Sequence, residues 1–329
     1  MQLRRDPITN TWVLQATAEP APAEGPGCPL CPGGRAGRAQ AIYEHPYGSQ
    51  EWQVKVIPHL YPLYRIEGDA ERRGEGVYDR MRNLGAHEVV VEHPDHNLPL
   101  SRQSDGHVAQ VLNAYATRIR DLKKDRRFRY VTVFRNQGVG AGQEFEHPHS
   151  EITATPFIPR RVGYELRATQ RYYQLKERCL VCDTVKQELT DQTRAVEWDE
   201  MFIAFCPYAS RVPYETWLLP VYHHHAFEED LSAADAQLCF ARMLKSVLRR
   251  LEAVSAAYHL VLHTSPNVYA KFDRTGNWQT LAEDYHWHIE ILPVVPAKSK
   301  SYSLKEVYYN SLPPENAARE LRKVAVPAD

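Results

Sequence analysis

One arrangement of cysteines and histidines occurs twice in this chain, and it constrains the fold more than any other feature. A C-x-x-C pair at residues 28–31 precedes an H-x-H pair at 147–149, and the same order recurs at 179–182 and 286–288. In both copies a glutamate lies two residues after the H-x-H pair. The repeat predicts a duplicated metal-binding scaffold, with two copies of one unit joined in tandem.

The segments between these motifs also repeat in the same order. Residues 88–96 and 215–223 are the most similar pair, because each is an apolar segment of equal length that ends on a histidine. Apolar runs of this length, bounded by turn residues, are typical of strands. We therefore expect two units, residues 1–160 and 161–329, with strands at 51–58, 87–92, 129–136 and 150–156 in the first and at 201–208, 215–220, 258–265 and 286–293 in the second.

Each unit is expected to contain one long helix between its second and third strands. The second helix opens with Ser232-Ala-Ala-Asp235, a variant of the capping box. The charged and aromatic segment 160–188 is expected to form a packed helical connector between the units. The first helix begins at Asp105, which is placed to cap it, and has apolar residues at helical spacing along one face, namely Val108, Val111, Leu112, Tyr115, Ile119 and Leu122.

The paired cysteines predict metal sites. Six cysteines are too few for a disulfide framework in a chain of 329 residues, and four of them form the two C-x-x-C pairs. Zinc takes four nitrogen and sulfur ligands, and a set completed by protein alone is structural because catalytic zinc keeps one position open. We predict two zinc ions, one bound by Cys28, Cys31, His96 and His147 and one by Cys179, Cys182, His223 and His286.

Other interpretations of these residues stay open. A C-x-x-C pair can be a redox pair, although that role expects a thioredoxin-like context, or a pair of unliganded thiols. In the second unit Glu165, His263, His286 and His288 are an alternative ligand set, in which a carboxylate and imidazoles suit zinc or iron. The C-x-x-C pair of that unit favours the set that contains sulfur.

The first H-x-H pair predicts a reactive histidine. Alternate side chains of a strand point to the same face, so His147 and His149 lie side by side, and His149 is free to react if His147 binds metal. An imidazole nitrogen can attack a phosphoryl group and form a covalent intermediate. The preceding segment, Asn136 to Gln143, contains Gly140 and Gly142, whose backbone amides can approach phosphate oxygens closely.

Composition restricts the partners of the chain. The formal net charge is -1, so the chain lacks the basic surface that a nucleic-acid-binding protein requires, and a small anionic ligand is the better expectation. No apolar run approaches the length of a membrane-spanning helix, and the first residues lack the apolar core of a signal peptide. We expect a cytoplasmic protein without a membrane or nucleic-acid partner.

Over nearly its whole length the chain resembles a known enzyme family. It is similar to the galactose-1-phosphate uridylyltransferase and ADP-glucose phosphorylase family, the transferase branch of the histidine-triad superfamily. The motifs that carry the resemblance are RRDPITNTWVL at the start, the first C-x-x-C, PDH at 94–96, the NQGVGAG loop, HPH at 147–149, PFIP after it, HWHIEI and the terminal SLPPENAARELR.

This resemblance implies a fold, a reaction and a site. The fold is α+β, with tandem duplicated histidine-triad-like units, mainly antiparallel sheets and packed helices, usually in a homodimer. The reaction is transfer of a nucleoside monophosphate from a nucleotide sugar to a phosphate-type acceptor, as in galactose metabolism. His149 matches the nucleophile and Asn136 a nucleotide contact, while Glu165, His263, His286 and His288 match a metal site of some members.

Three positions depart from the family pattern. Glu151 stands where the family has glutamine, Glu144 where a small hydroxyl residue is usual, and His59 where an asparagine contacts the substrate. One hypothesis makes Glu151 a general base for a hydroxyl, amine or water acceptor, which gives a hydrolase or a transferase to a non-phosphate acceptor. The other hypothesis is a non-catalytic nucleotide-binding zinc protein.

Overall fold

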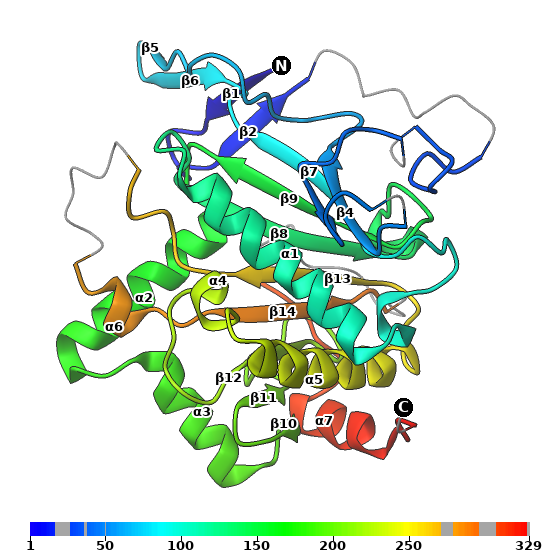
Figure 1. The fold of residues 1–329 in the computed structure, drawn as a ribbon. Coiled ribbons are helices and arrows are strands. Elements are labelled where there is room, and N and C mark those ends of the chain that lie inside the picture. The colour runs from blue at the N-terminus through cyan, green and yellow to red at the C-terminus, as the bar shows by residue number, and fades with distance from the viewer. Residues whose placement is uncertain (17–26, 36–37, 50, 271–278, 296–306, 328–329) are drawn as a thin grey trace.

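The computed structural model describes residues 1–16, 27–35, 38–49, 51–270, 279–295 and 307–327, which form one ten-stranded and one four-stranded sheet with helices on both faces of the larger one (Figure 1). The strands are β1 (Gln2–Arg5), β2 (Trp12–Gln15), β3 (Tyr43–His45), β4 (Val54–Pro58), β5 (Arg73–Glu75), β6 (Tyr78–Arg82), β7 (Ala86–Val91), β8 (Tyr130–Gln137), β9 (His149–Thr155), β10 (Ala195–Trp198), β11 (Phe202–Phe205), β12 (Thr216–Pro220), β13 (Tyr258–His263) and β14 (His288–Pro293). The helices are η1 (Leu100–Arg102), α1 (Asp105–Lys123), η2 (Val139–Ala141), α2 (Arg160–Lys176), α3 (Leu180–Asp191), α4 (Phe227–Asp230), α5 (Ala234–Glu252), α6 (Leu281–Asp284) and α7 (Pro314–Lys323).

The large sheet has the same strand order when read outward from its centre in either direction. Antiparallel β8 and β13 pair at the centre, for example through Arg135 and Leu260. Beyond β8 lie β9, β7, β4 and β3, and beyond β13 lie β14, β12, β11 and β10 in the corresponding places. The predicted α+β fold with mainly antiparallel strands is confirmed. The predicted boundary at residue 160 falls where α2 begins, and the strands on either side of it share one sheet.

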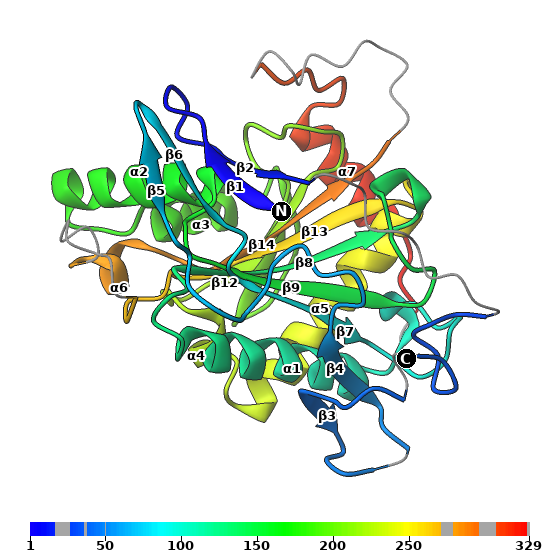
Figure 2. The ribbon, with the colours of Figure 1, turned by 90° about the horizontal axis from the view of Figure 1, so that it is seen from above.

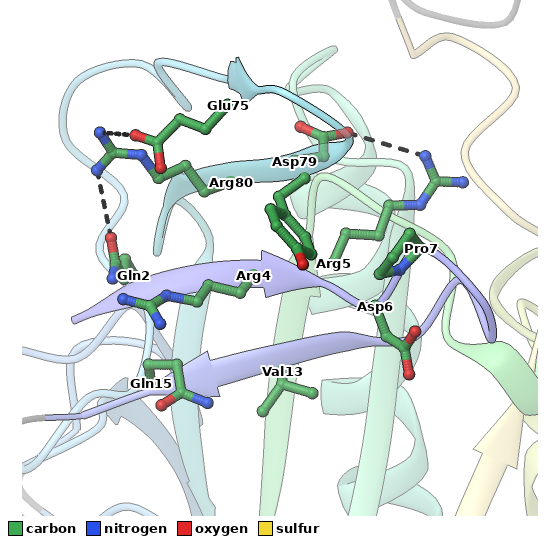
Figure 3. Close-up of a pocket in the computed structure, with 11 residues that line it drawn as sticks. Gln2, Arg4, Arg5, Asp6, Pro7, Val13, Gln15, Glu75, Asp79 and Arg80 are labelled. Atoms are coloured by element: carbon green, nitrogen blue, oxygen red, sulfur yellow. Dashed lines mark hydrogen bonds and ion pairs between the residues drawn. The ribbon is translucent and has the colours of Figure 1, made fainter.

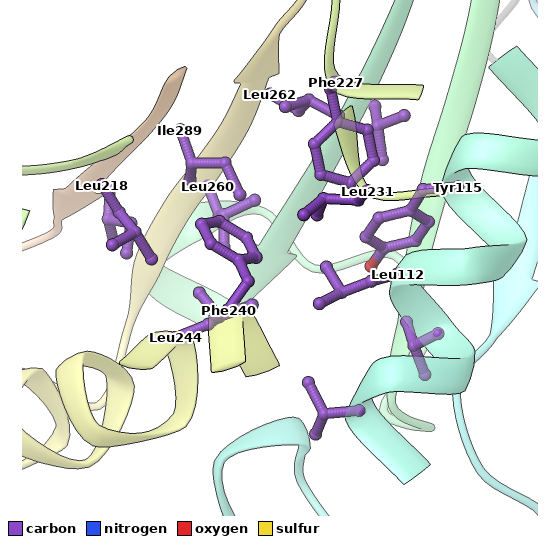
Figure 4. Close-up of a cluster of buried hydrophobic side chains, with 14 of the residues drawn as sticks. Leu112, Tyr115, Leu218, Phe227, Leu231, Phe240, Leu244, Leu260, Leu262 and Ile289 are labelled. Atoms are coloured by element: carbon purple, nitrogen blue, oxygen red, sulfur yellow. The ribbon is translucent and has the colours of Figure 1, made fainter. Parts of the chain in front are cut away.

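Helices α1 and α5 pack side by side on one face of this sheet (Figures 1 and 2). Figure 4 shows Leu112 and Tyr115 of α1 and Phe240 and Leu244 of α5 directed into a common core with residues of β12, β13 and β14. All six apolar residues predicted for the buried face of α1 are buried, and each buried side chain of this kind stabilises the fold by about 1.5–3 kcal/mol. Within the described ranges no helix is long and apolar enough to cross a membrane.

The predicted starts of the two long helices are wrong in detail. Ser104, not Asp105, caps α1, because its hydroxyl accepts the backbone N–H of His107 at 3.2 Å. Asp105 instead accepts a 2.6 Å hydrogen bond from Lys245 of α5, a side chain that is only 3% exposed and needs a counter-ion. For α5 the N-cap is Ala233, which has no side-chain hydrogen bond, so the capping box predicted at residues 232–235 does not form.

The connector consists of two helices separated by a sharp turn. Helix α2 ends at Glu177, whose φ of 55° is the left-handed conformation that stops a helix. Cys179 then caps α3, with its sulfur 3.5 Å from the backbone N of Cys182. Arg161 of α2 contacts Glu290, which points away from the core formed with α1 and α5. The connector therefore covers the opposite face of the sheet in its C-terminal half.

Candidate functional site

The structure brings together the first predicted metal set. Cys31 Sγ lies 3.6 Å from Nδ1 of His96 and 3.6 Å from Nδ1 of His147, and Cys28 Sγ lies 3.8 Å from the same atom of His147. Two ligands at tetrahedral angles around zinc, at the usual Zn–S and Zn–N lengths, are about 3.6 Å apart. The four side chains therefore fit one zinc ion with no open position.

The second predicted set has the same geometry. Cys182 Sγ lies 3.4 Å from Nδ1 of His223 and 3.5 Å from Nδ1 of His286, and Cys179 Sγ lies 4.0 Å from the latter. His286 belongs to both alternative ligand sets predicted from the sequence, and the structure places it beside Cys179 and Cys182. All eight predicted sulfur and nitrogen ligands form the expected two groups.

Backbone carbonyls orient three of the four histidines of the two groups. Nε2 of His147 donates to His93 O at 2.7 Å, Nε2 of His223 donates to Ala282 O at 2.7 Å, and Nε2 of His286 donates to Pro220 O at 3.1 Å. A carbonyl only accepts, so each Nε2 carries the ring proton and each Nδ1 turns its lone pair toward the thiols. The donor chemistry matches what a metal ligand requires.

The alternative set of the second unit forms a separate ion-pair cluster without His286. Its members are Glu165, His263 and His288, with Glu290 added. Arg161 donates to Glu290 at 2.7 Å and Arg211 donates to the same carboxylate at 2.6 Å. The hydrogen bond between His263 Nδ1 and Glu165 is 2.9 Å long. The negative charge of Glu290 is therefore already balanced by two guanidinium groups of the protein.

His149 is the candidate reactive residue, at the start of β9. Its Nδ1 donates to the backbone carbonyl of His147 at 2.7 Å, so the lone pair of the neutral ring is on Nε2. The residue is 3% exposed, and the ring of Phe145 meets it edge-on at 5.3 Å between centroids. Burial lowers the pKa of His149, which favours the neutral ring. The carbonyl of His147, a predicted metal ligand, thus sets the direction of Nε2 of His149.

The predicted nucleotide contact, Asn136, is held by the other half of the chain. Its side-chain oxygen lies 2.9 Å from Nδ1 of His259, which comes from β13. The sequence interpretation missed His259, because only the pairing of β8 with β13 brings the two residues together. Gly142 donates its N–H to Val139 O at 3.0 Å, so this amide closes the turn of the glycine loop. A Cβ at position 140 would lie 3.4 Å from Cβ of Ala257 in the second half.

Four further side chains gather beside His149 on the same face of the sheet. Glu151, two residues along β9, lies 2.8 Å from Nε2 of His87. His59 stacks on His87, with centroids 4.0 Å apart and planes at 8°, and its Nε2 lies 3.4 Å from Glu144 and 3.8 Å from Glu151. Burial raises the pKa of Glu144, but the interactions with His59, His87 and His149 together outweigh this effect, so the net shift is downward. His87 was not predicted from the sequence.

The pH dependence of stability is expected to report on His87. Burial lowers the pKa of His87 below its unfolded value, although the hydrogen bond to Glu151 opposes this shift. Below about pH 6.5 the unfolded chain therefore binds more protons than the folded chain, and the free energy of unfolding falls. In urea unfolding at about pH 7 and about pH 5, His87→Gln, which leaves His59 and Glu144 in place, should lose less stability than the parent. An equal or greater loss would contradict this assignment.

The second H-x-H pair repeats this local geometry. Nδ1 of His288 lies 3.2 Å from the carbonyl of His286, as Nδ1 of His149 does with His147. Nε2 of His288 is buried without a hydrogen-bond partner, and Glu165 of α2 contacts its neighbour His263. Both histidines are 3% exposed, and Glu165 of α2 lies beside the second.

A pocket of about 720 Å³ lies elsewhere, on the four-stranded sheet (Figure 3). Its lining comes from β1, the two residues after β1, and β2, β5 and β6, and it includes none of the residues grouped around His149. The charged groups of the pocket pair among themselves, as in Arg5 with Asp79 and Arg80 with Glu75, so we assign it no part in the chemistry of His149.

The chain is similar to known proteins over its whole length. Residues 4–159 match the N-terminal domain of galactose-1-phosphate uridyl transferase. ADP-glucose phosphorylase of Arabidopsis thaliana is 27% identical over 345 residues, which cover 99% of this chain and 93% of that protein. Galactose-1-phosphate uridylyltransferase of Thermotoga maritima is 27% identical over 337 residues, which cover 99% of each.

Solved structures extend the match to the whole fold. A uridylyltransferase structure has a TM-score of 0.81 at 27% identity, and the alignment covers 98% of this chain and 97% of that one. The crystal structure of ADP-glucose phosphorylase from Arabidopsis thaliana with bound ADP-glucose has a TM-score of 0.78 at 25% identity and covers 99% and 100%. The predicted resemblance is confirmed, since the chain is similar over its whole length to the enzymes galactose-1-phosphate uridylyltransferase and ADP-glucose phosphorylase.

Proposed function

We propose that this protein is a nucleotidyltransferase that takes a nucleoside monophosphate from a nucleotide sugar and carries it on Nε2 of His149. The observation that supports this most is the hydrogen bond from His149 Nδ1 to the carbonyl of His147. It leaves the Nε2 lone pair free in a buried site, where an imidazole is a competent nucleophile. The relatives that match over the whole chain support a nucleotide-sugar donor.

In the first step Nε2 of His149 attacks the phosphorus next to the nucleoside, and the bond from that phosphorus to the bridging oxygen breaks. The sugar phosphate leaves with that electron pair, and the nucleotidyl group remains on the nitrogen. Asn136, oriented by His259, and the amide of Gly140 are the proposed contacts to the nucleotide. By family resemblance alone the acceptor of the second step would be a phosphate, such as a hexose phosphate of galactose metabolism, although Glu144 and Glu151 depart from the family pattern beside His149.

Two structural zinc ions and a homodimer belong to the same proposal. Both cysteine and histidine groups supply four protein ligands, so zinc there stabilises the fold and leaves the phosphoryl chemistry to His149. The carbonyl of His147, a proposed zinc ligand, orients the nucleophile. Metal analysis and sedimentation of the purified protein measure the zinc content and the number of chains.

The covalent intermediate is the decisive prediction of this proposal. Incubation with UDP-glucose or ADP-glucose is expected to add one nucleoside monophosphate to the chain, observed by intact-mass spectrometry. His149→Ala should abolish the adduct, because it removes the nitrogen proposed to carry the nucleotidyl group. His225→Ala, a half-buried histidine outside the site, is the matched control and should still be labelled. No adduct on the parent chain, or an adduct that survives His149→Ala, would refute the proposal.

A further inference from the structure

His59 and His87 are held in one protonation form by the backbone. The N–H of Tyr61 donates to Nδ1 of His59 at 3.0 Å, and the N–H of Leu63 donates to Nδ1 of His87 at 3.1 Å. A nitrogen that accepts a hydrogen bond must offer its lone pair, so the proton of each neutral ring is on Nε2. Both rings therefore present an N–H group to the site.

This arrangement is the reverse of the one found at the metal groups. In His147, His223 and His286 the Nε2 atom donates to a backbone carbonyl, which places the ring proton away from the thiols. In His59 and His87 the Nδ1 atom accepts from a backbone N–H, which places the ring proton on Nε2, toward Glu151. The nitrogens of these two rings and the Glu151 carboxylate come within 4.8 Å of one another, but a cation there would meet two N–H groups. The cluster is therefore a set of hydrogen-bond donors and not a metal site.

The same kind of contact opposes a second proton on His87. That proton would have to bind Nδ1, where it would face the N–H of Leu63. Burial also lowers the pKa of His87. The Glu151 carboxylate thus receives a hydrogen bond from a ring whose neutral form is favoured, while His59 Nε2 lies 3.4 Å from Glu144 and 3.8 Å from Glu151 without a hydrogen bond.

A cation lies on the same face, but it is farther along the sheet. Lys55 of β4 pairs in register with Val91, which pairs with His149. Its Nζ lies 6.0 Å from the ring centroid of Trp52. Lys55 is therefore two strands away from His149, in register with it, whereas Glu151 lies two residues farther along β9.

We propose that the acceptor for the nucleotidyl group is a neutral hydroxyl, of an alcohol or of water, and that Glu151 is its general base. This inference rests on the proposed nucleotidyl-His149 intermediate. The carboxylates of Glu144 and Glu151 beside His149 repel an incoming phosphate dianion, whereas a hydroxyl needs a group that takes its proton. His87 is a positioning residue, because it holds the Glu151 carboxylate through its Nε2–H group, and His59 stacks on the ring of His87.

The proposed step balances without a further reactant. The acceptor oxygen attacks the phosphorus on His149, and the bond from phosphorus to Nε2 breaks. The electron pair of that bond returns to Nε2, and the acceptor proton passes to the Glu151 carboxylate. The product is a nucleoside monophosphate when water attacks and a nucleotide ester when an alcohol attacks.

The test measures the discharge of the labelled full-length protein, which is the loss of the nucleotidyl group from His149. The adduct, freed of donor, is mixed in separate experiments with buffer alone, glycerol, inorganic phosphate or a hexose 1-phosphate, and the products are identified by mass. Discharge in buffer or to glycerol is expected to exceed discharge to either phosphate, and the buffer and glycerol products distinguish water from an alcohol. Glu151→Gln should slow discharge to hydroxyls by about 10²- to 10⁴-fold and raise discharge to phosphate.

Further variants separate a positioning role from a merely structural one. His87→Ala should slow discharge to hydroxyls, and His87→Gln, which restores an N–H donor, should recover part of that rate. Faster discharge to phosphate than to hydroxyls in the parent, or no effect of Glu151→Gln, would overturn the inference and leave the intermediate intact. A third zinc ion that is lost in His87→Ala would overturn the donor assignment. Failure to form any adduct would refute the proposed function and this inference with it.

Discussion

Cys28→Ser is expected to remove one of two zinc ions from the chain and to lower the rate of His149 labelling by about 10- to 100-fold. The reason is that His147 has two roles in the structure. Its Nδ1 lies 3.8 Å from the Cys28 sulfur, and its carbonyl accepts the hydrogen bond that directs the nucleophile. Loss of the metal frees residue 147, so the orientation of His149 is lost with it. Zinc analysis and the labelling rate by mass spectrometry measure both effects.

Cys239→Ser is the control for this prediction. Cys239 is half-buried, and its thiol donates to Asp199 outside both metal groups, so the variant should retain two zinc ions and the parent rate. Chelation of zinc from the parent protein should lower the rate of His149 labelling, as Cys28→Ser does. A Cys28→Ser protein with two zinc ions, or with full labelling, would show that the first group does not support the site.

Glu92→Ala is expected to destabilise the fold by about 3–5 kcal/mol, because it leaves a buried guanidinium without a counter-ion. Glu92 is fully buried and accepts from Arg135 Nε at 3.0 Å, and Arg135 is 2% exposed. The same carboxylate accepts the hydroxyl of Ser150, the residue after His149. The loss of unfolding free energy should be measurable by urea denaturation and should be accompanied by slower labelling of His149.

An exposed ion pair supplies the comparison for Glu92. Glu71 pairs with Arg82 at 2.8 Å, with side chains 39% and 62% exposed. Exposed pairs contribute about 0–1 kcal/mol, so Glu71→Ala should change the free energy of unfolding by no more than that. Equal effects of the two substitutions would show that the buried position of Glu92 is not what makes its charge important.

The sequence predicts those parts of the site that depend on spacing along the chain. Both C-x-x-C pairs and their distant histidines could be assigned because metal ligation restricts the residue types so strongly. His87 could not be assigned in the same way, since its contact with Glu151 depends on the pairing of β7 with β9. The protonation form of His59 and His87 depends on two backbone N–H groups, which no side-chain pattern encodes.

The fold was predictable to a similar degree. The eight predicted strands and the buried face of α1 follow from apolar periodicity, and the structure contains them. The short strands β1, β2, β3, β5, β6 and β10 were not predicted. The helix caps were wrong where a tertiary contact competes with a local one, as when Lys245 takes the carboxylate of Asp105. The packing of α2 beside His288 was not predictable either, because both pairs share the H-x-H-x-E pattern.

The central pairing of β8 with β13 has a consequence for synthesis on the ribosome. Strand β8 emerges well before β13, since the whole segment 138–257 lies between them in the chain. Until β13 is made, one side of β8 presents unpaired backbone groups, and an edge of this kind readily pairs with other chains. Nascent chains that stop short of residue 258 are therefore the species most prone to aggregate, and they are the form in which a chaperone would be needed.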